Sequence, residues 1–177
     1  MHSTRTALLK RQADELGLPL ELVLIPADCS NEVYEEKMQT LIKKAQCEKI
    51  GAMGFGDLFL TEIREYRERQ LAGTGIEAVF PLWGTPTAAL AQEICSSGIE
   101  AVLTCVDPRR LPASFVGRYF DPKTISEFPS DVDPCGENGE FHSFVFSSPN
   151  FNRFRFLRRF TCILISNRSI SINGRRR

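Results

Sequence analysis

The sequence has no hydrophobic run long enough to cross a membrane, and its N-terminus lacks the apolar core of a secretory signal peptide. Its six cysteines are scattered, with no Cys-x-x-Cys pair and no spacing typical of a disulfide framework. Thiols in a chain without an export signal are expected to stay reduced. These absences predict a globular cytoplasmic protein, and 177 residues allow one ordinary domain or two small ones.

Net charge is also absent, but the zero balance hides an uneven distribution. Residues 151–177 hold eight arginines and no acidic residue, so residues 1–150 hold 14 basic and 22 acidic side chains, a net charge of −8. A basic tail with interleaved phenylalanines can stack on single-stranded RNA. The interpretation we favour is that this tail is an out-of-register extension of the reading frame, so a nucleic-acid partner is not expected.

The first half of the chain alternates helical and strand patterns. Helices are expected over residues 4–17, 32–47 and 58–71, and short apolar runs typical of buried strands cover residues 20–25 and 50–56. Asn31 is the expected N-cap of the second helix. This order of elements predicts a parallel sheet with right-handed crossovers.

A second, smaller α/β unit follows. Residues 79–84 form an apolar loop with the only tryptophan, and Thr85 is expected to cap a helix that has Pro86 at its first position. A further strand is expected over residues 101–106. The predicted divisions of the chain are residues 1–78, 79–150 and 151–177.

The most polar stretch is Asp131–His142, which is followed directly by an apolar run, Phe144–Phe146. Within it, Gly136 and Gly139 permit tight turns, and Pro134 fixes the entry. Three titratable side chains are thereby expected to lie close together: Glu137, Glu140 and His142. Such convergence of titratable groups suggests a functional site.

Two other interpretations of this stretch remain open. The first is an acidic turn that enters a strand, with Cys135 as a small buried hydrophobic residue and His142 hydrogen-bonded at the strand start. The second is a metal site made by Cys135, Glu137, Glu140 and His142. One cysteine and one histidine without a paired Cys-x-x-Cys or His-x-x-x-His are a weak zinc signal, so no metal site is expected.

A second candidate position is Asp57, which follows the strand expected at 50–56. Ligands of parallel sheets bind at the carboxyl ends of the strands, although an Asp in this position is also a common helix N-cap. The charged segment Arg64–Arg69 follows Asp57 in the sequence. By default its pattern is that of a solvated helix face with ion pairs such as Glu65–Arg69.

The segment Asp133–His142 resembles the signature of the diphthine–ammonia ligase family, which are ATP pyrophosphatases of the PP-loop superfamily. The similarity runs from Met1 to about Phe151, and further blocks match in the order of that family. They are His2 and Arg5, Gln12-Ala13, Gly17–Leu20, Tyr34-Glu35, Gly54–Asp57, Arg64–Glu68, Phe80–Gly84, Val106-Asp107 and Gly117-Arg118.

The resemblance implies an α/β fold: a partial Rossmann-like parallel sheet, of the adenine nucleotide alpha hydrolase type, followed by a smaller α/β subdomain. It implies ATP-dependent amidation, in which a substrate carboxylate attacks the α-phosphate of ATP, pyrophosphate leaves and ammonia displaces AMP. The implied ligands are ATP with Mg²⁺, ammonia and a carboxylate acceptor, which is diphthine on elongation factor 2 in archaeal and eukaryotic relatives. A homodimer is compatible with this reading.

The resemblance also implies roles for individual residues. Those beside the nucleotide would be Gly56, Asp57, Arg64 and Arg67, with Asp57 as a magnesium or ribose contact. Those on the acceptor side would be Cys135, Gly136, Asn138, Gly139 and Arg118. Candidates for proton handling or ammonium binding are Glu137, Glu140 and His142.

The sequence departs from the family in having no Ser-Gly-Gly-Lys-Asp-Ser segment, the loop whose backbone amides hold the leaving pyrophosphate. Met1 aligns inside the family's first domain, so the resemblance predicts an N-terminally truncated chain with an exposed sheet edge and very weak or absent adenylation. The alternatives are a noncatalytic remnant that binds a ligand or partner, and a basic-tailed RNA-binding protein. Details such as Phe59–Ile63 resemble bacterial members whose cells make no diphthamide, where the acceptor would be another carboxylate.

Overall fold

The computed structural model describes residues 4–26, 29–151 and 162–165, and the chain divides into two compact units. One unit comprises Met1–Leu22 with Pro86–Ser169, and the other comprises Val23–Thr85 with Ile170–Arg177. We call the first the acidic-loop unit, after the polar loop at residues 131–142, and the second the βαβ unit, and describe each by itself. Most of the basic tail predicted over residues 151–177 lies outside the described residues.

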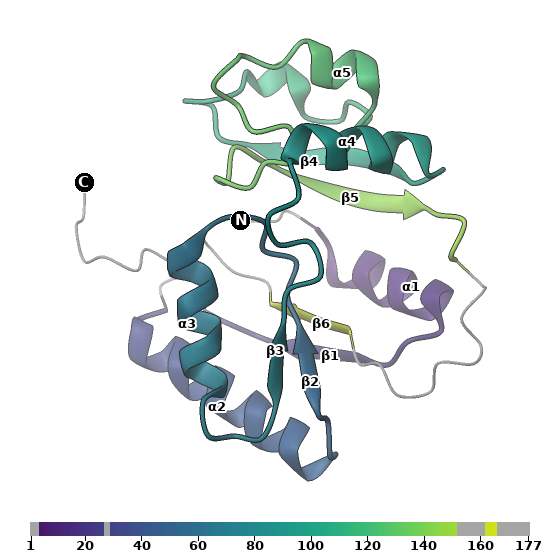
Figure 1. The fold of residues 1–177 in the computed structure, drawn as a ribbon. Helices are drawn as coiled ribbons and strands as arrows, with labels where there is room; N and C mark the ends of the chain where they lie inside the picture. Colours follow the sequence, from purple (N-terminus) through teal and green to yellow (C-terminus); the bar gives the residue numbers. More distant parts are fainter. Residues whose placement is uncertain (1–3, 27–28, 152–161, 166–177) are drawn as a thin grey trace. The chain divides into compact units, whose positions relative to one another are not determined.

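The βαβ unit is built on two parallel strands joined by a helix (Figure 1). Its elements are α2 (Asn31–Cys47), β2 (Ala52–Gly54), α3 (Thr61–Leu71) and β3 (Glu77–Val79). Strands β2 and β3 pair in the register Ala52↔Glu77, Met53↔Ala78 and Gly54↔Val79. The strand predicted over residues 50–56 is therefore in a parallel pair, but its partner is β3, which was not predicted, and not the strand predicted over residues 20–25.

Helix α2 has the apolar spacing expected from the sequence. Met38, Leu41, Ile42 and Ala45 are buried, because residues three and four apart share one helix face. The N-cap prediction was wrong by one residue: Ser30 is the cap, and its hydroxyl accepts a hydrogen bond from the Val33 N–H at 3.4 Å. Ser and Asn are both good capping residues, so adjacent candidates leave the start of the helix undecided.

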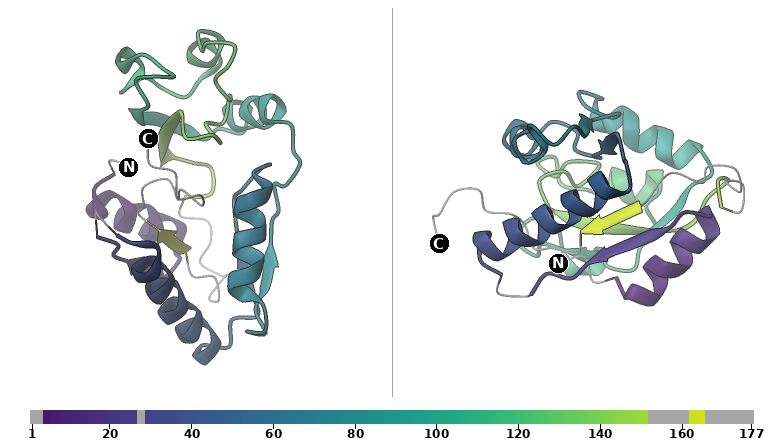
Figure 2. Two further views of the ribbon diagram at one scale, coloured as in Figure 1. Left: turned by 90° about the vertical axis from the view of Figure 1, so that its left-hand side faces the viewer. Right: turned by 90° about the horizontal axis from the view of Figure 1, so that it is seen from below.

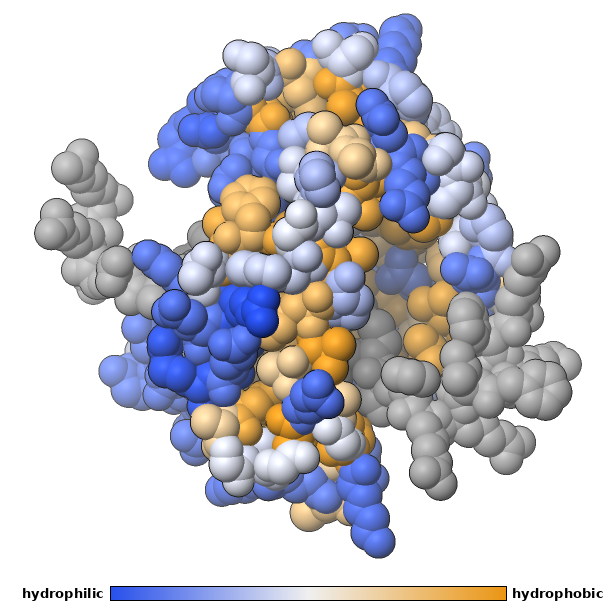
Figure 3. Space-filling view, in the orientation of Figure 1, coloured by the Kyte–Doolittle hydropathy of each residue, from blue (hydrophilic) through white to orange (hydrophobic). Residues whose placement is uncertain are grey.

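Helix α3 lies alongside β2 and β3 in Figure 1 and in the left view of Figure 2. In the space-filling view, hydrophobic residues reach the surface over β2 and β3, beside the hydrophilic side chains of α3 (Figure 3). Ala52 and Gly54 of β2 are exposed, while Met53 between them is buried. This alternation is the normal behaviour of a strand with one covered face.

The acidic-loop unit is centred on an antiparallel pair, β4 (Glu100–Val106) and β5 (Phe141–Ser147). Its other elements are α1 (Thr6–Leu16), most of β1 (Leu20–Val23), α4 (Thr87–Ser96), the 3₁₀ turn η1 (Ala113–Phe115), α5 (Pro122–Ser126) and β6 (Cys162–Ile165). The Gln12 side chain of α1 donates a hydrogen bond to the Val145 carbonyl of β5 at 2.8 Å. Helix α1 ends as predicted at Gly17, whose φ of 66° is left-handed.

Strand pairing differs from the expected single parallel sheet. The described strands form three two-stranded sheets, β1–β6, β2–β3 and β4–β5. The strand expected over residues 20–25 forms as β1, but its partner is β6. Hydrophobic runs identify strands without naming their partners, because every strand offers the same backbone donors and acceptors at its edges. The mixed α/β class is confirmed, and the Rossmann-like arrangement and the division at residues 78 and 150 stay predictions.

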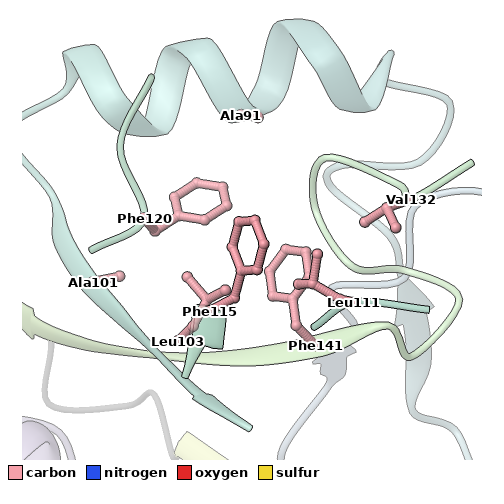
Figure 4. Close-up of a cluster of buried hydrophobic side chains, with 8 residues drawn as sticks. All are labelled: Ala91, Ala101, Leu103, Leu111, Phe115, Phe120, Val132 and Phe141. Atoms are coloured by element: carbon pink, nitrogen blue, oxygen red, sulfur yellow. The ribbon is translucent and has the colours of Figure 1, made fainter. Parts of the chain in front are cut away.

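The core of the acidic-loop unit lies between α4 and the β4–β5 pair (Figure 4). Its buried side chains are Ala91, Ala101, Leu103, Leu111, Phe115, Phe120, Val132 and Phe141. Leu103 and Leu111 are 1% and 0% exposed, so truncating either to Ala would cost about 2–5 kcal/mol of stability. Val132 and Phe141 lie near the two ends of residues 131–142, so this core holds both ends of that loop.

The start of α4 also differs from the prediction. Pro86 is the residue that precedes the helix, its carbonyl accepting from the Leu90 N–H at 3.0 Å, so Thr85 does not cap the helix. No helix within residues 4–26, 29–151 and 162–165 is long and apolar enough to span a membrane.

Candidate functional site

The acidic loop, residues Asp131–His142, is folded around the side chain of Asp133. Its Oδ2 accepts hydrogen bonds from the backbone N–H groups of Cys135, at 3.0 Å, and Glu137, at 2.9 Å. The Gly136 N–H donates to the Asp133 carbonyl at 2.9 Å. Asp side chains commonly make such bonds to the backbone that follows them. The sequence therefore forms a fixed turn here, and Asp133 is a loop-organising residue that the sequence analysis did not single out.

Gly136 is required at its position for two reasons. Its φ is 72°, a left-handed conformation, and a Cβ atom there would lie 2.9 Å from the Phe141 carbonyl oxygen and 3.1 Å from two carbons of the Phe141 ring. Gly139 has a φ of 83°, but a Cβ atom there would meet no atom within 4 Å. The loop backbone is thus packed against the start of β5 at Gly136 and open at Gly139.

Glu140 is buried beneath the loop, with 1% of its surface exposed. Its Oε1 accepts hydrogen bonds from the Asp133 N–H and the Asn138 side-chain amide, each at 3.0 Å. Its Oε2 is buried without a hydrogen-bond partner. A buried carboxylate is tolerated when donors and a cation surround it. Glu140 therefore connects the beginning and the end of the loop.

The cation nearest to Glu140 is Arg110, which the sequence analysis missed. Its Nη2 lies 4.0 Å from Glu140 Oε1 and donates to the Asp131 carbonyl at 2.7 Å. The Asp107 N–H donates to the Glu140 carbonyl at 2.8 Å, which ties the end of the loop to the residue after β4. Arg110 lies in a turn 30 residues from Glu140 in sequence, so no local pattern connects the two.

The Cys135 thiol is half-buried and donates a hydrogen bond to the Thr87 carbonyl at 3.3 Å. Burial, and then the negative charges of Asp133 and Glu137, raise the pKa of this thiol to about 11. A neutral thiol is a poor nucleophile and a poor metal ligand. Cys135 thus fits the packing interpretation of the sequence, as a small side chain that seats the loop against α4.

The other two titratable residues of the loop lie in different settings. Glu137 is half-buried in the Asp133 turn, close enough for its charge to act on the Cys135 thiol. His142 belongs to β5, opposite Cys105, and its carbonyl accepts from the Thr104 hydroxyl at 3.1 Å. Alternation along β5 turns the His142 side chain away from the face on which Phe141 joins the core.

The convergence expected for Glu137, Glu140 and His142 is therefore partial. Glu140 is buried under the loop, Glu137 is half-buried within the turn, and the imidazole of His142 projects from β5. Within the part of the chain that the structure describes, no group of three or more His, Cys, Asp or Glu side chains could hold a metal ion.

Arg118, expected on the acceptor side, is engaged within its own unit. Its Nη1 donates to Glu127 Oε2 at 2.7 Å, and its guanidinium carbon lies 4.6 Å from the centre of the Phe115 ring. The hydrogen bond from Arg118 lowers the pKa of Glu127, and the same bond raises the pKa of Arg118. A role in binding substrate stays a prediction.

The predicted nucleotide residues lie in the βαβ unit. Gly56 and Asp57 follow β2, as expected, but Asp57 does not cap α3, which begins at Thr61 after Leu60. Instead, Asp57 Oδ2 lies 3.8 Å from Arg67 Nε. The expected pair Glu65–Arg69 occurs at 3.9 Å on the exposed face of α3.

Arg64 sits among aromatic side chains of the loop that follows β3. Its guanidinium carbon is 4.9 Å from the centre of the Phe80 ring and 4.8 Å from that of the Trp83 ring. Its Nε donates to Glu68 Oε1 at 2.8 Å. These contacts combine cation–π attraction with an ion pair on the helix surface.

Comparison with known proteins gives one family match. Residues 86–159 match the family described as the diphthamide synthase C-terminal domain. The matched stretch, of which residues 152–159 lie outside the described part of the chain, includes α4, β4, Arg110, Arg118 and the whole acidic loop. The matched stretch covers less than half of the 177 residues. A comparison with curated proteins found no match to the chain. The match supports the resemblance to diphthamide synthases over this stretch.

Proposed function

We propose that the protein takes part in an ATP-dependent amide ligation of the diphthamide synthase type. Its acidic loop would form the site where an activated carboxylate meets ammonia. The observation that carries the proposal is the acidic loop itself, which lies within the matched family stretch and is held in one conformation by Asp133, Glu140 and Arg110. A fixed polar loop positions reactants without reorganising during the reaction.

The proposed reaction has two steps. A carboxylate oxygen of the acceptor forms a bond to the α-phosphorus of ATP. The bond from that phosphorus to the oxygen bridging the α- and β-phosphates breaks, and pyrophosphate leaves with that oxygen. Ammonia then attacks the acyl carbon, AMP leaves with the acyl–oxygen bond, and one proton is released to give the amide. The half-buried Glu137 is the carboxylate that we assign to that proton, because Glu140 is committed to the loop's own hydrogen bonds.

Other residues of the acidic loop would bind the acceptor. Asn138 and Gly139 are exposed, and the open space at Gly139 lets a substrate approach the backbone. His142 and Arg118 are proposed to face the acceptor side. The acceptor would be diphthine on elongation factor 2 or another carboxylate. The amide that forms would depend on which of these carboxylates the loop binds.

The nucleotide side of the reaction is proposed for Gly56, Asp57, Arg64 and Arg67. Mg²⁺ would enter with the phosphates of ATP, since it is commonly held by one or two carboxylates plus phosphate oxygens, and Asp57 is the carboxylate at this place. The 177 residues hold no Ser-Gly-Gly-Lys-Asp-Ser loop for pyrophosphate, so adenylation by this chain alone is expected to be slow.

The test has two readouts with the full chain. AMP release from ATP is measured with ammonium and with elongation factor 2 that carries diphthine, and hydrogen exchange of residues 131–142 is followed when the acceptor is added. We expect slow AMP release that requires both acceptor and ammonium and is lost in Glu137→Gln. The matched control, Glu93→Gln, should keep the activity because Glu93 is exposed on α4 and lies outside the loop.

The outcomes separate the candidate functions. Protection of the loop without AMP release would indicate a binding domain that has lost catalysis. The absence of both protection and AMP release would refute the proposed ligase function with this acceptor. Amide formation can be verified by mass spectrometry of the acceptor peptide.

A further inference from the structure

The acidic-loop unit contains a pocket outside the acidic loop. Its volume is about 270 Å³, and it lies between the end of α4, the start of β4 and the segment that precedes α5. Its lining includes Cys95, Glu100, Tyr119, Phe120 and Asp121. Pockets for drug-sized ligands span about 300–1,000 Å³, so this one has room for a small molecule and not for a nucleotide.

One side of the pocket is fixed by the core. The Phe120 N–H donates to the Ala101 carbonyl of β4 at 2.9 Å, and the Phe120 ring lies beneath α4 among buried side chains (Figure 4). The Cys95 thiol of α4 donates to the Phe120 carbonyl at 3.7 Å. Burial, and then the charge of Asp121, raise the pKa of this thiol, so it is protonated near neutral pH. Cys95 therefore adds no charge to the pocket.

Tyr119 supplies an aromatic wall to the pocket. Its side chain is 60% exposed, and its ring lies 5.8 Å from the ring of Phe146 between centroids. An isolated bridge between Val102 and Tyr119 fixes the backbone beside β4. The face of an aromatic ring attracts cations, because its π-electrons make that face negative. Tyr119 is thus an exposed ring that is held in place at the pocket.

Two carboxylates line the same pocket. Asp121 Oδ1 accepts a hydrogen bond from the Thr124 N–H at 2.7 Å, and this bond is the main cause of its lowered pKa. The charges of Arg118 and Lys123 lower that pKa further, so Asp121 is ionised and partly balanced. Glu100 is exposed, and its side chain has no ion pair within the part of the chain that the structure describes. Glu100 therefore supplies the less balanced negative charge.

This combination selects for an alkylated cation. The carboxylates repel anions, and the described residues include no group of three or more His, Cys, Asp or Glu side chains that could hold a metal ion. Ile99, Ala101 and Pro122 add apolar surface to the lining. An ammonium nitrogen that carries methyl groups suits an aromatic and apolar wall, because it gives up fewer hydrogen bonds to water than a primary ammonium does.

We propose that this pocket binds a small quaternary ammonium compound, with its methyl groups against Tyr119 and its charge near Glu100 and Asp121. The inference goes beyond the proposed function, because these residues are assigned neither to the acceptor nor to the nucleotide. Binding at this pocket requires no ligase activity, so it can be measured on the chain by itself.

The experiment is an NMR titration of the full chain with three matched probes, read from the shifts of residues 95–101 and 119–122. Choline carries a trimethylated ammonium group. Dimethylbutanol has a carbon atom in place of the charged nitrogen, and ethanolamine keeps the charge without the methyl groups. We expect choline to bind more tightly than either, because only choline combines the two features. Ethanolamine at equal concentration also controls for ionic strength.

Three variants locate the binding. Tyr119→Leu removes the ring and should weaken choline binding about two- to fivefold, the range for one exposed cation–π contact. Glu100→Gln should weaken choline binding to a similar degree and leave dimethylbutanol binding unchanged, because only the charged probe interacts with the carboxylate. Glu93→Gln is the matched control on the exposed surface of α4 and should keep the affinity for choline.

The proposal would be overturned if choline gave no saturable shifts at these residues, or if dimethylbutanol or ethanolamine bound as tightly as choline. Equal affinity of Tyr119→Leu and the wild type for choline would also overturn it. An equal loss of affinity in Glu93→Gln and Glu100→Gln would show attraction to the acidic unit as a whole and no site. Tyr119, Glu100 and Glu93 are all exposed, so the variants are expected to fold.

Discussion

The carboxylate of Glu140 accepts a hydrogen bond from the backbone N–H of Asp133 at 3.0 Å, which ties the end of the acidic loop to its beginning. A residue expected to handle protons is thus the anchor of its own loop. The half-buried Glu137 and the exposed Asn138 are held on the loop that this anchor fixes. Glu140 therefore positions the loop, and the catalytic role is proposed for Glu137, which lies three residues before it.

The first prediction concerns this anchor. Glu140→Ala leaves the Asp133 N–H and the Asn138 amide without their acceptor, so it should reduce the free energy of unfolding by about 1–3 kcal/mol. Glu140→Gln, the matched variant, keeps one carbonyl oxygen that can accept a hydrogen bond, so its free energy of unfolding should fall by less. Urea unfolding of the two variants measures the difference, and equal stability of Glu140→Ala and the wild type would contradict the role of an anchor.

The two glycines of the loop should respond differently to alanine. Both have positive φ, which costs about 1–2 kcal/mol for a residue with a Cβ atom. Gly136→Ala adds a clash with the Phe141 carbonyl at 2.9 Å, whereas Gly139→Ala meets open space. Thermal unfolding should show a clearly larger loss of stability for Gly136→Ala. Equal losses in the two variants would mean that the loop can move away from Phe141.

The Cys135 thiol should be slow to react. With a pKa of about 11 it is almost fully protonated near neutral pH, so iodoacetamide should modify the exposed Cys47 first. Mass spectrometry of the modified peptides measures the order. Modification of Cys135 as fast as Cys47 at pH 8 would show that the thiol leaves its contact with Thr87 readily.

The same pKa predicts a loss of stability in alkali. The folded-state pKa of about 11 lies above the ordinary thiol value of 9.0, so the folded protein keeps a proton that the unfolded chain releases. This contribution to stability is complete below about pH 9 and is lost as the pH rises toward 11. Cys135→Ser should show a shallower fall in unfolding free energy over that window, and identical pH profiles would contradict the shift.

The Arg118–Glu127 pair gives a prediction in acid. Arg118 lowers the pKa of Glu127 through a 2.7 Å hydrogen bond, so its contribution to stability is present above the ordinary carboxyl pKa and is lost as the pH falls through the lowered value. Arg118→Gln should return the Glu127 pKa toward 4.5 in an NMR titration. Asp121 is an internal control, because the Thr124 N–H is the main cause of its lowered pKa and should keep it low.

Helix and strand positions followed from local patterns. The predicted helices over residues 4–17 and 32–47 and the predicted strand over 101–106 match α1, α2 and β4 within a few residues. The exceptions were decided by single hydrogen bonds, as at Ser30, where two neighbouring residues could each cap the helix. Strand β3 was missed because its three residues are too few to establish a period.

The site was predicted in part. The glycines, the acids and the histidine of residues 131–142 marked a loop, and the family match includes all of it. Arg110 and the organising role of Asp133 were missed, because both act through contacts that residue spacing does not reveal. The proposed roles of Glu137, His142 and the nucleotide residues stay predictions.

The sequence by itself determined the mixed α/β character, the positions of most elements and the acidic loop as the segment of interest. These depend on periodicity, capping and turn residues, which act over a few positions along the chain. Only the tertiary structure decided that β1 pairs with β6, that Glu140 is buried beneath the loop beside Arg110, and that Cys95 and Tyr119 line one pocket. Burial and long-range pairing depend on which surfaces meet in space, and residues distant in the sequence carry no local signal of that meeting.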